Sequence, residues 1–161
     1  MEKDKAEGLV PMAIIVPALL DEQTHKARLD ELEVLVHEEM LWLHVDLRTE
    51  GCFAFLNRFK YLTKLEQADS ASLDGRLHLR CGQDMHLMWT RDRHVVITGL
   101  QFPDVSRLVE AEKHQLVDFK DLNIFLSKRS RSFKLWMVLK AYGMNPLKEH
   151  IALLAPRVKL F

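Results

Sequence analysis

The length and composition of the chain predict a globular protein, because 161 residues, 48% of them hydrophobic, can bury the core of one domain or slightly more. The 23 basic residues balance the 23 acidic residues, so the overall charge gives no argument for binding nucleic acid or an anionic membrane. The apolar runs are far shorter than the roughly 20 residues that a transmembrane helix needs.

The amino terminus and the cysteines indicate the cellular compartment. Met1–Lys5 is highly charged and does not have the pattern of a secretory signal. Cys52 and Cys81 form neither a C-x-x-C pair nor a disulfide framework, which suits a reducing compartment. We therefore expect a cytoplasmic protein in which both cysteines are packing residues.

A strand, a helix and a second strand are predicted first. Met12–Val16 is a short apolar run between two prolines, which end a β-ladder. From Thr24, the expected N-cap, apolar residues recur at helical spacing as far as Val36. Leu41–Asp46 is almost wholly apolar, which is typical of a central parallel strand. Residues 12–46 thus predict a parallel, right-handed βαβ unit.

Asp46 closes the second strand and is the first candidate functional residue. Open parallel sheets bind ligands at the carboxyl ends of their strands, where the loops form a crevice. The alternative is that the carboxylate caps the following turn through the backbone. The strand alone leaves both interpretations open.

The middle of the chain predicts short elements. Phe53–Leu65 indicates one or two short helices, and Ala68–Leu73 a strand of small residues. Three further strands are predicted after the turn Asp74–Gly75: Leu77–Cys81, Met85–Trp89 and Val95–Thr98. Gln101–Lys120 has no clean period and is expected to be loop with some helix.

Two helices are predicted near the carboxyl end. One face of the first is marked by Phe133, Trp136, Met137, Lys140 and Ala141. Gly143 is placed to be its left-handed cap, and Asn145–Pro146 predicts the N-cap and first residue of the second helix. The apolar stripe of the second helix is Leu147, Ile151 and Leu154, and Pro156 is expected to end it.

Blocks along the whole chain carry a family resemblance: Glu2–Lys5 with Gly8–Pro11, Trp42–Asp46, Ala68–Ser70, Met88–Arg93, Arg129–Trp136 and Tyr142–Gly143. In order and spacing, apart from the variable loop before residue 118, they resemble the group II pyridoxal-phosphate decarboxylases. Within that family the aromatic-L-amino-acid and histidine decarboxylases are most similar.

The resemblance implies an α/β fold with a mostly parallel sheet and flanking helices. Residues 1–125 would form a partial large domain of the aspartate-aminotransferase type (fold type I), and residues 126–161 the helices at the start of the small domain. Family members are several times longer, and their phosphate-binding loop and ring-stacking histidine lie upstream of the matched region. A folded monomer should therefore leave an apolar strand edge and sheet face uncovered.

The resemblance assigns roles to few residues of this chain. Asp46 matches the aspartate that pairs with the pyridine nitrogen and keeps it protonated, so that the ring acts as an electron sink. The Schiff-base lysine of the family motif Asn-Pro-His-Lys aligns with Leu77, which cannot form an imine. Arg48 stands where the family has an alanine near the ring, and would crowd it.

Two further family features are absent. Leu19–Asp21 replaces a Gly-Thr-Thr loop, and Gln101–Asp118, onto which the loop with a catalytic tyrosine maps, contains no tyrosine. The pattern indicates a retained scaffold and a lost catalytic set, with Asp46 as the vestigial exception. We expect no catalytic residue and no cofactor, or pyridoxal phosphate if the family activity is retained.

Three interpretations of function remain. The first is an inactive decarboxylase homologue that acts by binding a full-length decarboxylase or a second copy through the shared dimer surface, or another protein through its uncovered sheet. The second is a pyridoxal-phosphate carboxy-lyase of aromatic amino acids or histidine, completed by a companion chain or by the rest of a longer product. The third is a degenerate reading frame.

Other clusters give weaker hypotheses. The pairs His37 with His44 and His78 with His86 lack the short spacing of a metal site, so no metal is expected, and His44 is expected to be a satisfied core residue. Ser70 and Ser72 have no histidine at a nucleophile spacing. The basic run Lys128–Arg131 is expected to be structural rather than a phosphate site or nuclear signal. Arg48 and Arg76 could bind some other anion.

Overall fold

The structure is a computed structural model that describes residues 2–19, 21–100 and 130–158. The chain forms two compact units: Met1–Arg91 together with Arg131–Phe161, and Asp92–Ser130. The boundary predicted between residues 125 and 126 lies outside the described residues, so the division into a large-domain part and a small-domain part stays a prediction.

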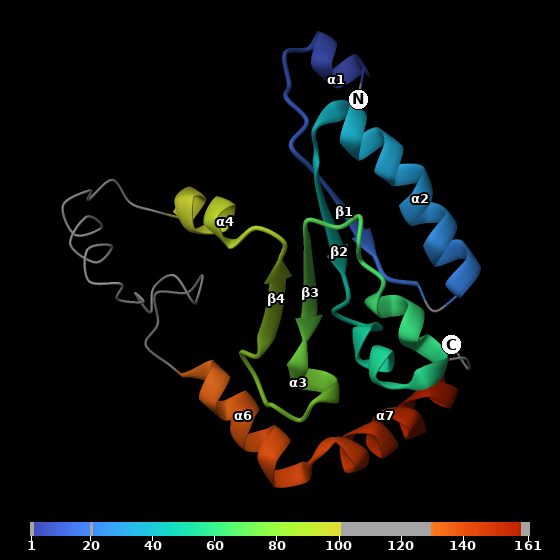
Figure 1. The fold of residues 1–161 in the computed structure, drawn as a ribbon, viewed down its shortest axis with the longest axis vertical. Helices are drawn as coiled ribbons and strands as arrows, with labels where there is room; N and C mark the ends of the chain where they lie inside the picture. The colour runs from blue at the N-terminus through green and yellow to red at the C-terminus, as the bar shows by residue number, and fades with distance from the viewer. Residues whose placement is uncertain (1, 20, 101–129, 159–161) are drawn as a thin grey trace, which may run out of the picture. The chain divides into compact units, whose positions relative to one another are not determined.

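The first unit is built on a four-stranded sheet in the order β1-β2-β3-β4 (Figure 1). The strands are β1 (Ala13–Pro17), β2 (Trp42–Asp46), β3 (Ser70–Asp74) and β4 (His86–Thr90). The pairs β1–β2 and β2–β3 are parallel, and β4 runs antiparallel to β3. The mostly parallel sheet and the central place of β2 are therefore confirmed.

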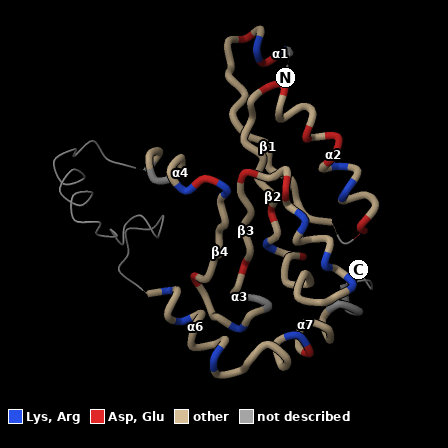
Figure 2. The backbone as a smooth tube through the Cα atoms, in the orientation of Figure 1, with Lys and Arg blue, Asp and Glu red and all other residues tan. Residues whose placement is uncertain are grey.

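Helix α2 (Glu22–Glu39) connects β1 to β2 and has both acidic and basic residues along its length (Figure 2). Its N-cap is Asp21, whose carboxylate accepts a hydrogen bond from the Thr24 amide at 2.8 Å, so Thr24 lies in the first turn and is not the cap. Leu29 is buried on the side of the helix that faces the core. The predicted parallel βαβ unit is confirmed.

Alternate residues of the strands point to opposite faces of the sheet. One face is the core, where Leu43 and Val45 of β2 are fully buried beside Ala71 and Leu73 of β3. It packs against the short 3-10 helices η1 (Gly51–Phe55) and η2 (Asn57–Thr63) and against α7 (Met144–Val158). The helices η1 and η2 agree with the one or two short helices predicted over Phe53–Leu65.

Cys52 and Cys81 are both free and fully buried in that core. Burial raises the pKa of the Cys52 thiol to about 12 and also raises the pKa of Cys81. Such thiols are poor nucleophiles near neutral pH. Their expected role as packing residues is confirmed.

The opposite face of the sheet is partly open. The sheet register places Ile15 beside His44 and Ser72 beside Met88 on this side. Ile15 is 68% exposed and Met88 45% exposed. The expectation of an uncovered sheet face agrees with these exposures in the described part of the chain.

Two predicted strands are wrong. Leu77–Cys81 begins inside helix α3 (Gly75–His78), because the Asp74 carboxylate accepts from the Arg76 amide at 2.7 Å and caps a helix directly after β3. Val95–Thr98 lies in helix α4 (Arg93–Leu100) of the second unit, where Asp92 accepts from the His94 amide at 2.8 Å. In both places a capping carboxylate outweighs a short run of strand-forming residues.

The carboxyl-terminal helices are α6 (Arg131–Tyr142) and α7, separated by Gly143 at a φ of +72°, as predicted for the cap. The stripe of α7 is confirmed, since Leu147 and Ile151 are buried and Leu154 packs on the core. However, α7 continues through Pro156 to Val158. Proline has a helical φ, so near the end of a helix it removes one hydrogen bond without ending the last turn.

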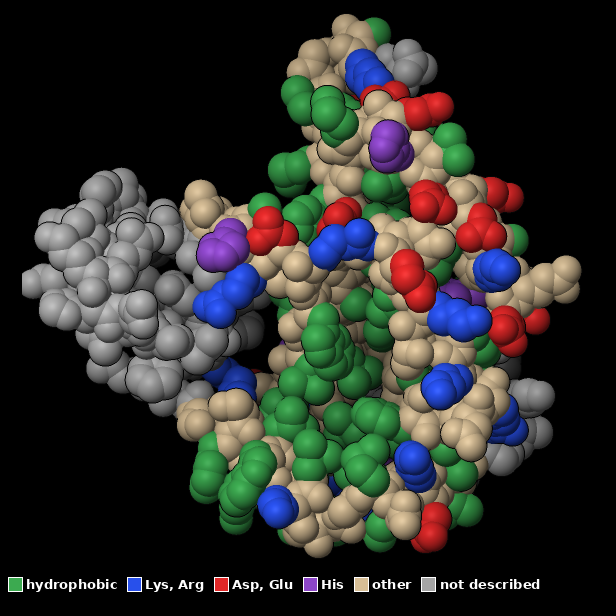
Figure 3. Space-filling view, in the orientation of Figure 1, with side chains coloured by type: hydrophobic (Ala, Val, Ile, Leu, Met, Phe, Trp, Pro, Cys, Tyr) green, Lys and Arg blue, Asp and Glu red, His purple; other side chains and the backbone are tan. Residues whose placement is uncertain are grey.

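Helix α6 turns its predicted face outward. Phe133 is 59% exposed and Trp136 52% exposed, and their rings stack with centroids 5.8 Å apart. Leu135 and Val138 are the residues of α6 that pack on the core. In the space-filling view, hydrophobic side chains gather over α6 (Figure 3).

Candidate functional site

Asp46 lies at the carboxyl end of β2, opposite Pro17 of β1 and Ser72 of β3. Both of its carboxylate oxygens accept hydrogen bonds from Arg48. The Arg48 amide donates to Oδ1 at 2.9 Å, Nε lies 2.9 Å from Oδ1 and 2.8 Å from Oδ2, and Nη2 lies 2.5 Å from Oδ2. The backbone bond is the turn cap that the sequence left open as an alternative.

The charges at this pair stabilise each other. The Arg48 guanidinium holds the pKa of Asp46 below its ordinary value, although partial burial acts in the opposite direction. The Asp46 side chain is 17% exposed, whereas that of Arg48 is 61% exposed. Asp46 is therefore an ionised carboxylate whose opposite charge is already supplied by the chain.

A second carboxylate and arginine lie at the end of the neighbouring strand. Asp74 is buried at the end of β3, and Arg76 Nη2 lies 3.2 Å from its Oδ2. Asp46 raises the pKa of Arg48 through its hydrogen bonds and its charge, and the charge of Asp74 raises it further. The Arg48 guanidinium therefore interacts electrostatically with both carboxylates. The structure thus brings Asp46, Arg48 and Asp74 together at one edge of the sheet, with Arg76 beside them.

Leu77 is at the same edge, in α3 directly after β3. The resemblance places the Schiff-base lysine at this position. The residues present do not fit pyridoxal phosphate there, because position 77 carries no amine and Arg48 engages both oxygens of Asp46. No step through the cofactor can be derived from this arrangement.

A hydrogen-bonded chain occupies the open face beside Asp46. Trp42 Nε1 donates to Ser70 Oγ at 2.8 Å, and Ser70 Oγ is also hydrogen-bonded to His44 Nδ1 at 2.7 Å. His44 Nε2 is hydrogen-bonded to Ser72 Oγ at 3.0 Å, so one ring nitrogen of the neutral histidine donates and the other accepts. Burial lowers the pKa of His44, with Asp46 opposing this effect.

The hydrogen bonds of His44 and Ser70 bear on two of the predictions made from the sequence. Both nitrogens of His44 have partners, as expected for a satisfied histidine, but the residue is half-buried on the open face of the sheet and does not lie in the core, where the sequence predicted it. Residue spacing did not predict that His44 would lie within hydrogen-bond distance of Ser70 and Ser72. Ser70 is nevertheless only 4% exposed and already accepts from Trp42, so it is poorly placed to attack a substrate.

The other predicted residues are scattered. Asp21 caps α2, and its neighbour Leu20 lies outside the described residues, as do Lys128 and Arg129 and the tyrosine-free segment of residues 101–118. His37 lies on α2, and His86 is exposed on β4. Within residues 2–19, 21–100 and 130–158, no group of three or more His, Cys, Asp or Glu side chains is arranged to hold a metal ion.

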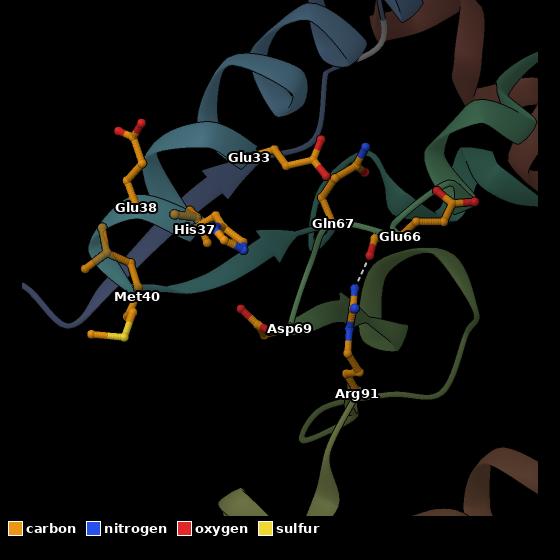
Figure 4. Close-up of a pocket in the computed structure, with 10 residues that line it drawn as sticks. Glu33, His37, Glu38, Met40, Glu66, Gln67, Asp69 and Arg91 are labelled. Carbon is orange, nitrogen blue, oxygen red and sulfur yellow. Dashed lines mark hydrogen bonds between the residues drawn. The ribbon is translucent and has the colours of Figure 1, made fainter.

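An open groove of about 810 Å³ lies at the opposite, amino-terminal edge of the sheet (Figure 4). Glu33 and His37 of α2 line it together with Gln67, Asp69 and Arg91. Arg91 Nη2 donates to the Glu66 carbonyl, and the Asp69 carboxylate accepts from the Leu43 amide at 2.8 Å. These two side chains therefore stabilise the segment that leads into β3. No contact of the described residues that line the groove indicates a ligand.

Sequence reasoning also missed His25, which lies one turn before Leu29 on the buried side of α2. The signal was available, because positions 25, 29 and 32 have the spacing of one helical face. His25 is 3% exposed and lines a smaller pocket against η2.

Comparison with known proteins supports the resemblance. The model of the pyridoxal-dependent decarboxylase conserved domain matches residues 1–160. Tyrosine decarboxylase 4 of Petroselinum crispum is 33% identical over 92% of this chain and 30% of its own length. The chain therefore spans about a third or less of the curated relatives that it matches.

Solved structures agree with this assignment. The 4-hydroxyphenylacetaldehyde synthase of Rhodiola rosea is 31% identical, with a TM-score of 0.71 over 94% of this chain and 30% of that one. The Oryza sativa TDC with PLP and tryptamine is 26% identical, with a TM-score of 0.75 over 94% of this chain and 31% of that one. The fold is that of part of these proteins, and the chain belongs to the pyridoxal-dependent decarboxylase family.

Proposed function

We propose that this chain is a pseudoenzyme of the decarboxylase family, which does not decarboxylate amino acids and acts by binding another protein. The observation that carries the proposal is the bonding of both Asp46 oxygens to Arg48. Leu77, at the position where the resemblance expects the Schiff-base lysine, supports it independently. We place the protein in the cytoplasm, consistent with two free, buried cysteines.

Exposed apolar side chains support the binding role. Phe133, Trp136 and Met137 of α6 are each about half exposed, which we define as the α6 patch. Apolar groups of this kind are typical of surfaces that another chain covers. The partner that we favour is a full-length decarboxylase or a second copy of this chain. None of the described helices has the length and apolar character needed to cross a membrane.

A second candidate function is the family reaction itself, decarboxylation of an aromatic amino acid or histidine with pyridoxal phosphate. The similarity to a tyrosine decarboxylase and to the rice TDC favours it. This candidate requires residues from outside the described chain to supply the amine that Leu77 lacks.

The deciding experiment is an absorbance titration of the purified chain with pyridoxal phosphate, followed by borohydride reduction and intact-mass measurement. The proposal expects no saturable imine band and no adduct of one cofactor per chain. A family decarboxylase treated in parallel should give both signals.

A control separates specific binding from surface labelling. Exposed lysines react weakly with aldehydes, so peptide mapping of any adduct is needed. A spread of substoichiometric adducts over many lysines leaves the proposal standing. One stoichiometric lysine adduct, together with release of carbon dioxide from an aromatic amino acid, establishes the second candidate instead.

A further inference from the structure

Strand β1 lies at one edge of the four-stranded sheet, because the order β1-β2-β3-β4 gives it a single described neighbour (Figure 1). It pairs with β2 in parallel along its whole length. The other side of an edge strand has a row of backbone N–H and C=O groups that face no strand of the same sheet. A strand of another chain can pair with such a row.

Two backbone hydrogen bonds show which groups of β1 face outward. The Trp42 amide donates to the Met12 carbonyl at 3.1 Å, and the Ala18 amide donates to the Asp46 carbonyl at 2.9 Å. The backbone groups of even-numbered residues in this segment therefore face β2. Since the direction of these groups alternates along a strand, those of the odd-numbered residues face away from β2. The odd-numbered residues of β1 are Ala13, Ile15 and Pro17.

The outward groups of β1 are accessible. Among residues 2–19, 21–100 and 130–158, none of these groups has a hydrogen-bond partner. Proline has no amide hydrogen, so the row consists of the amides of Ala13 and Ile15 and three carbonyls. All three side chains are exposed, and that of Ile15 is 68% exposed. β1 also contains no charged residue, which is a common protection of a free edge against pairing.

Two copies of this row complement each other when they run antiparallel about a two-fold axis at Ile15. The two Ile15 residues then exchange N–H···O=C bonds, and each Ala13 amide faces the Pro17 carbonyl of the second copy. Every outward amide therefore has an acceptor. Pro17, which cannot donate, supplies only a carbonyl, and the Ala13 carbonyls at the two ends remain open to water. The partial charges of the two backbones thus match along the whole strand.

Other symmetric arrangements match less well. In a parallel dimer with the two-fold axis along the strands, each residue faces its own copy, so amide would oppose amide. An antiparallel register centred on Ile14 would place Pro17 opposite Pro11, and neither proline can donate a hydrogen bond. The donors and acceptors of β1 therefore favour the antiparallel register centred on Ile15.

We propose that β1 is the interface of a homodimer, in which a second copy of the chain pairs its own β1 in this antiparallel register. The two four-stranded sheets then form one continuous sheet. The two Ile15 side chains lie on the same face and contact each other across the axis. The proposal rests on the binding role proposed above, since it names a second copy as a partner, but it uses no residue of the α6 patch.

The first test places a cysteine at the two-fold axis. Hydrogen-bonded residues of antiparallel strands have Cα atoms about 5.5 Å apart, which a disulfide can span. Ile15→Cys should therefore give a covalent dimer on mild oxidation or with a short bis-maleimide. Met12→Cys is the control, because Met12 is 80% exposed but its two copies would lie roughly 20 Å apart. Cys52 and Cys81 are buried and should not react.

The second test uses charge at the same position. Ile15→Lys places two like charges opposite each other, so the dimer should weaken at least about tenfold by sedimentation velocity. An equimolar mixture of Ile15→Lys with Ile15→Glu should recover the dimer, because opposite charges then face each other. Val34→Lys adds the same charge at a site of α2 that is 59% exposed, and should leave the dimer unchanged.

The wild-type chain should show a dimer whose fraction increases with protein concentration. A chain that stays monomeric, equal crosslinking of the two cysteine variants, a dimer that tolerates Ile15→Lys, or no recovery in the mixture would each overturn the proposal. If circular dichroism shows that Ile15→Lys is unfolded, the cysteine pair decides. The pyridoxal phosphate titration reads no property of β1, so failure of the dimer and failure of the inactive-enzyme proposal are distinguished.

Discussion

The edge of the sheet at Asp46 and the pocket at His25 differ in how their polar groups are satisfied. At the edge, Asp46 and Asp74 are each paired with an arginine two residues later in the sequence. In the pocket, a buried ring nitrogen has no partner among the described residues. At the edge where the family resemblance places chemistry, each carboxylate already has an arginine partner, whereas in the pocket, to which the resemblance assigns no role, the buried ring nitrogen lacks one among the described residues.

The largest effect is expected from the core that supports both regions. Leu43→Ala removes a fully buried side chain of β2 and should lower the free energy of unfolding by about 2–5 kcal/mol. Ile15→Ala, on the open face of the same sheet, should change it by less than about 0.5 kcal/mol. Urea unfolding of both variants checks this, and equal losses would contradict the assignment of the two faces.

A smaller loss is expected at Asp74. Asp74→Ala removes the cap of α3 and leaves Arg76 without its carboxylate, which should cost about 1–2 kcal/mol. Thermal unfolding monitored by circular dichroism provides the measurement. Because Asn can still cap a helix, Asp74→Asn should recover about half of the loss, and no recovery would argue against the capping role.

The pair at Asp46 should make stability depend on pH. The folded-state pKa of Asp46 is depressed, so its contribution is present above the unfolded value of about 4 and is lost as the pH falls through the folded pKa. Asp46→Asn should flatten this part of the acid limb, with a difference at pH 7 of no more than about 1 kcal/mol. Urea unfolding at several pH values from 7 to 3 compares the two proteins. Parallel curves would show that the pair contributes no linkage.

The smallest effect on stability is expected at the α6 patch. Trp136→Ser replaces a side chain that is 52% exposed, so the free energy of unfolding should change by less than about 0.5 kcal/mol. Binding to a full-length decarboxylase, or of one β1-paired dimer to another, should weaken at least tenfold by sedimentation velocity. Lys140→Ser on the same helix is the control. Unchanged association in the tryptophan variant would remove the patch from the proposed interface.

Patterns that depend on neighbouring residues in the sequence were the easiest to predict. The apolar run of β2, the cap at Gly143 and the stripe of α7 need only local periodicity, and all three are confirmed. The strands predicted over Leu77–Cys81 and Val95–Thr98 failed because each has the composition of a strand but follows a capping aspartate.

The candidate sites were harder, because their properties depend on contacts between distant segments. The turn at Asp46 could be anticipated as one of two alternatives, since Arg48 is two residues away. The unpaired nitrogen of His25 could not, because it follows from hydrogen bonds that the Leu19 backbone makes with His25 and Tyr61. The exposure of the apolar side of α6 could not be predicted either, because the sequence identifies an apolar face but not whether other residues cover it.

The short distance along the chain between Asp46 and Arg48 affects how tightly any other cation must bind the Asp46 carboxylate. A guanidinium attached two residues away competes for the carboxylate as an intramolecular ligand, at an effective concentration of millimolar or above. A free cation at micromolar concentration must therefore bind the carboxylate about a thousandfold more tightly than Arg48 does in order to displace half of it. Competition of this kind needs no change of fold, because a single arginine two residues along the chain is enough to occupy the carboxylate.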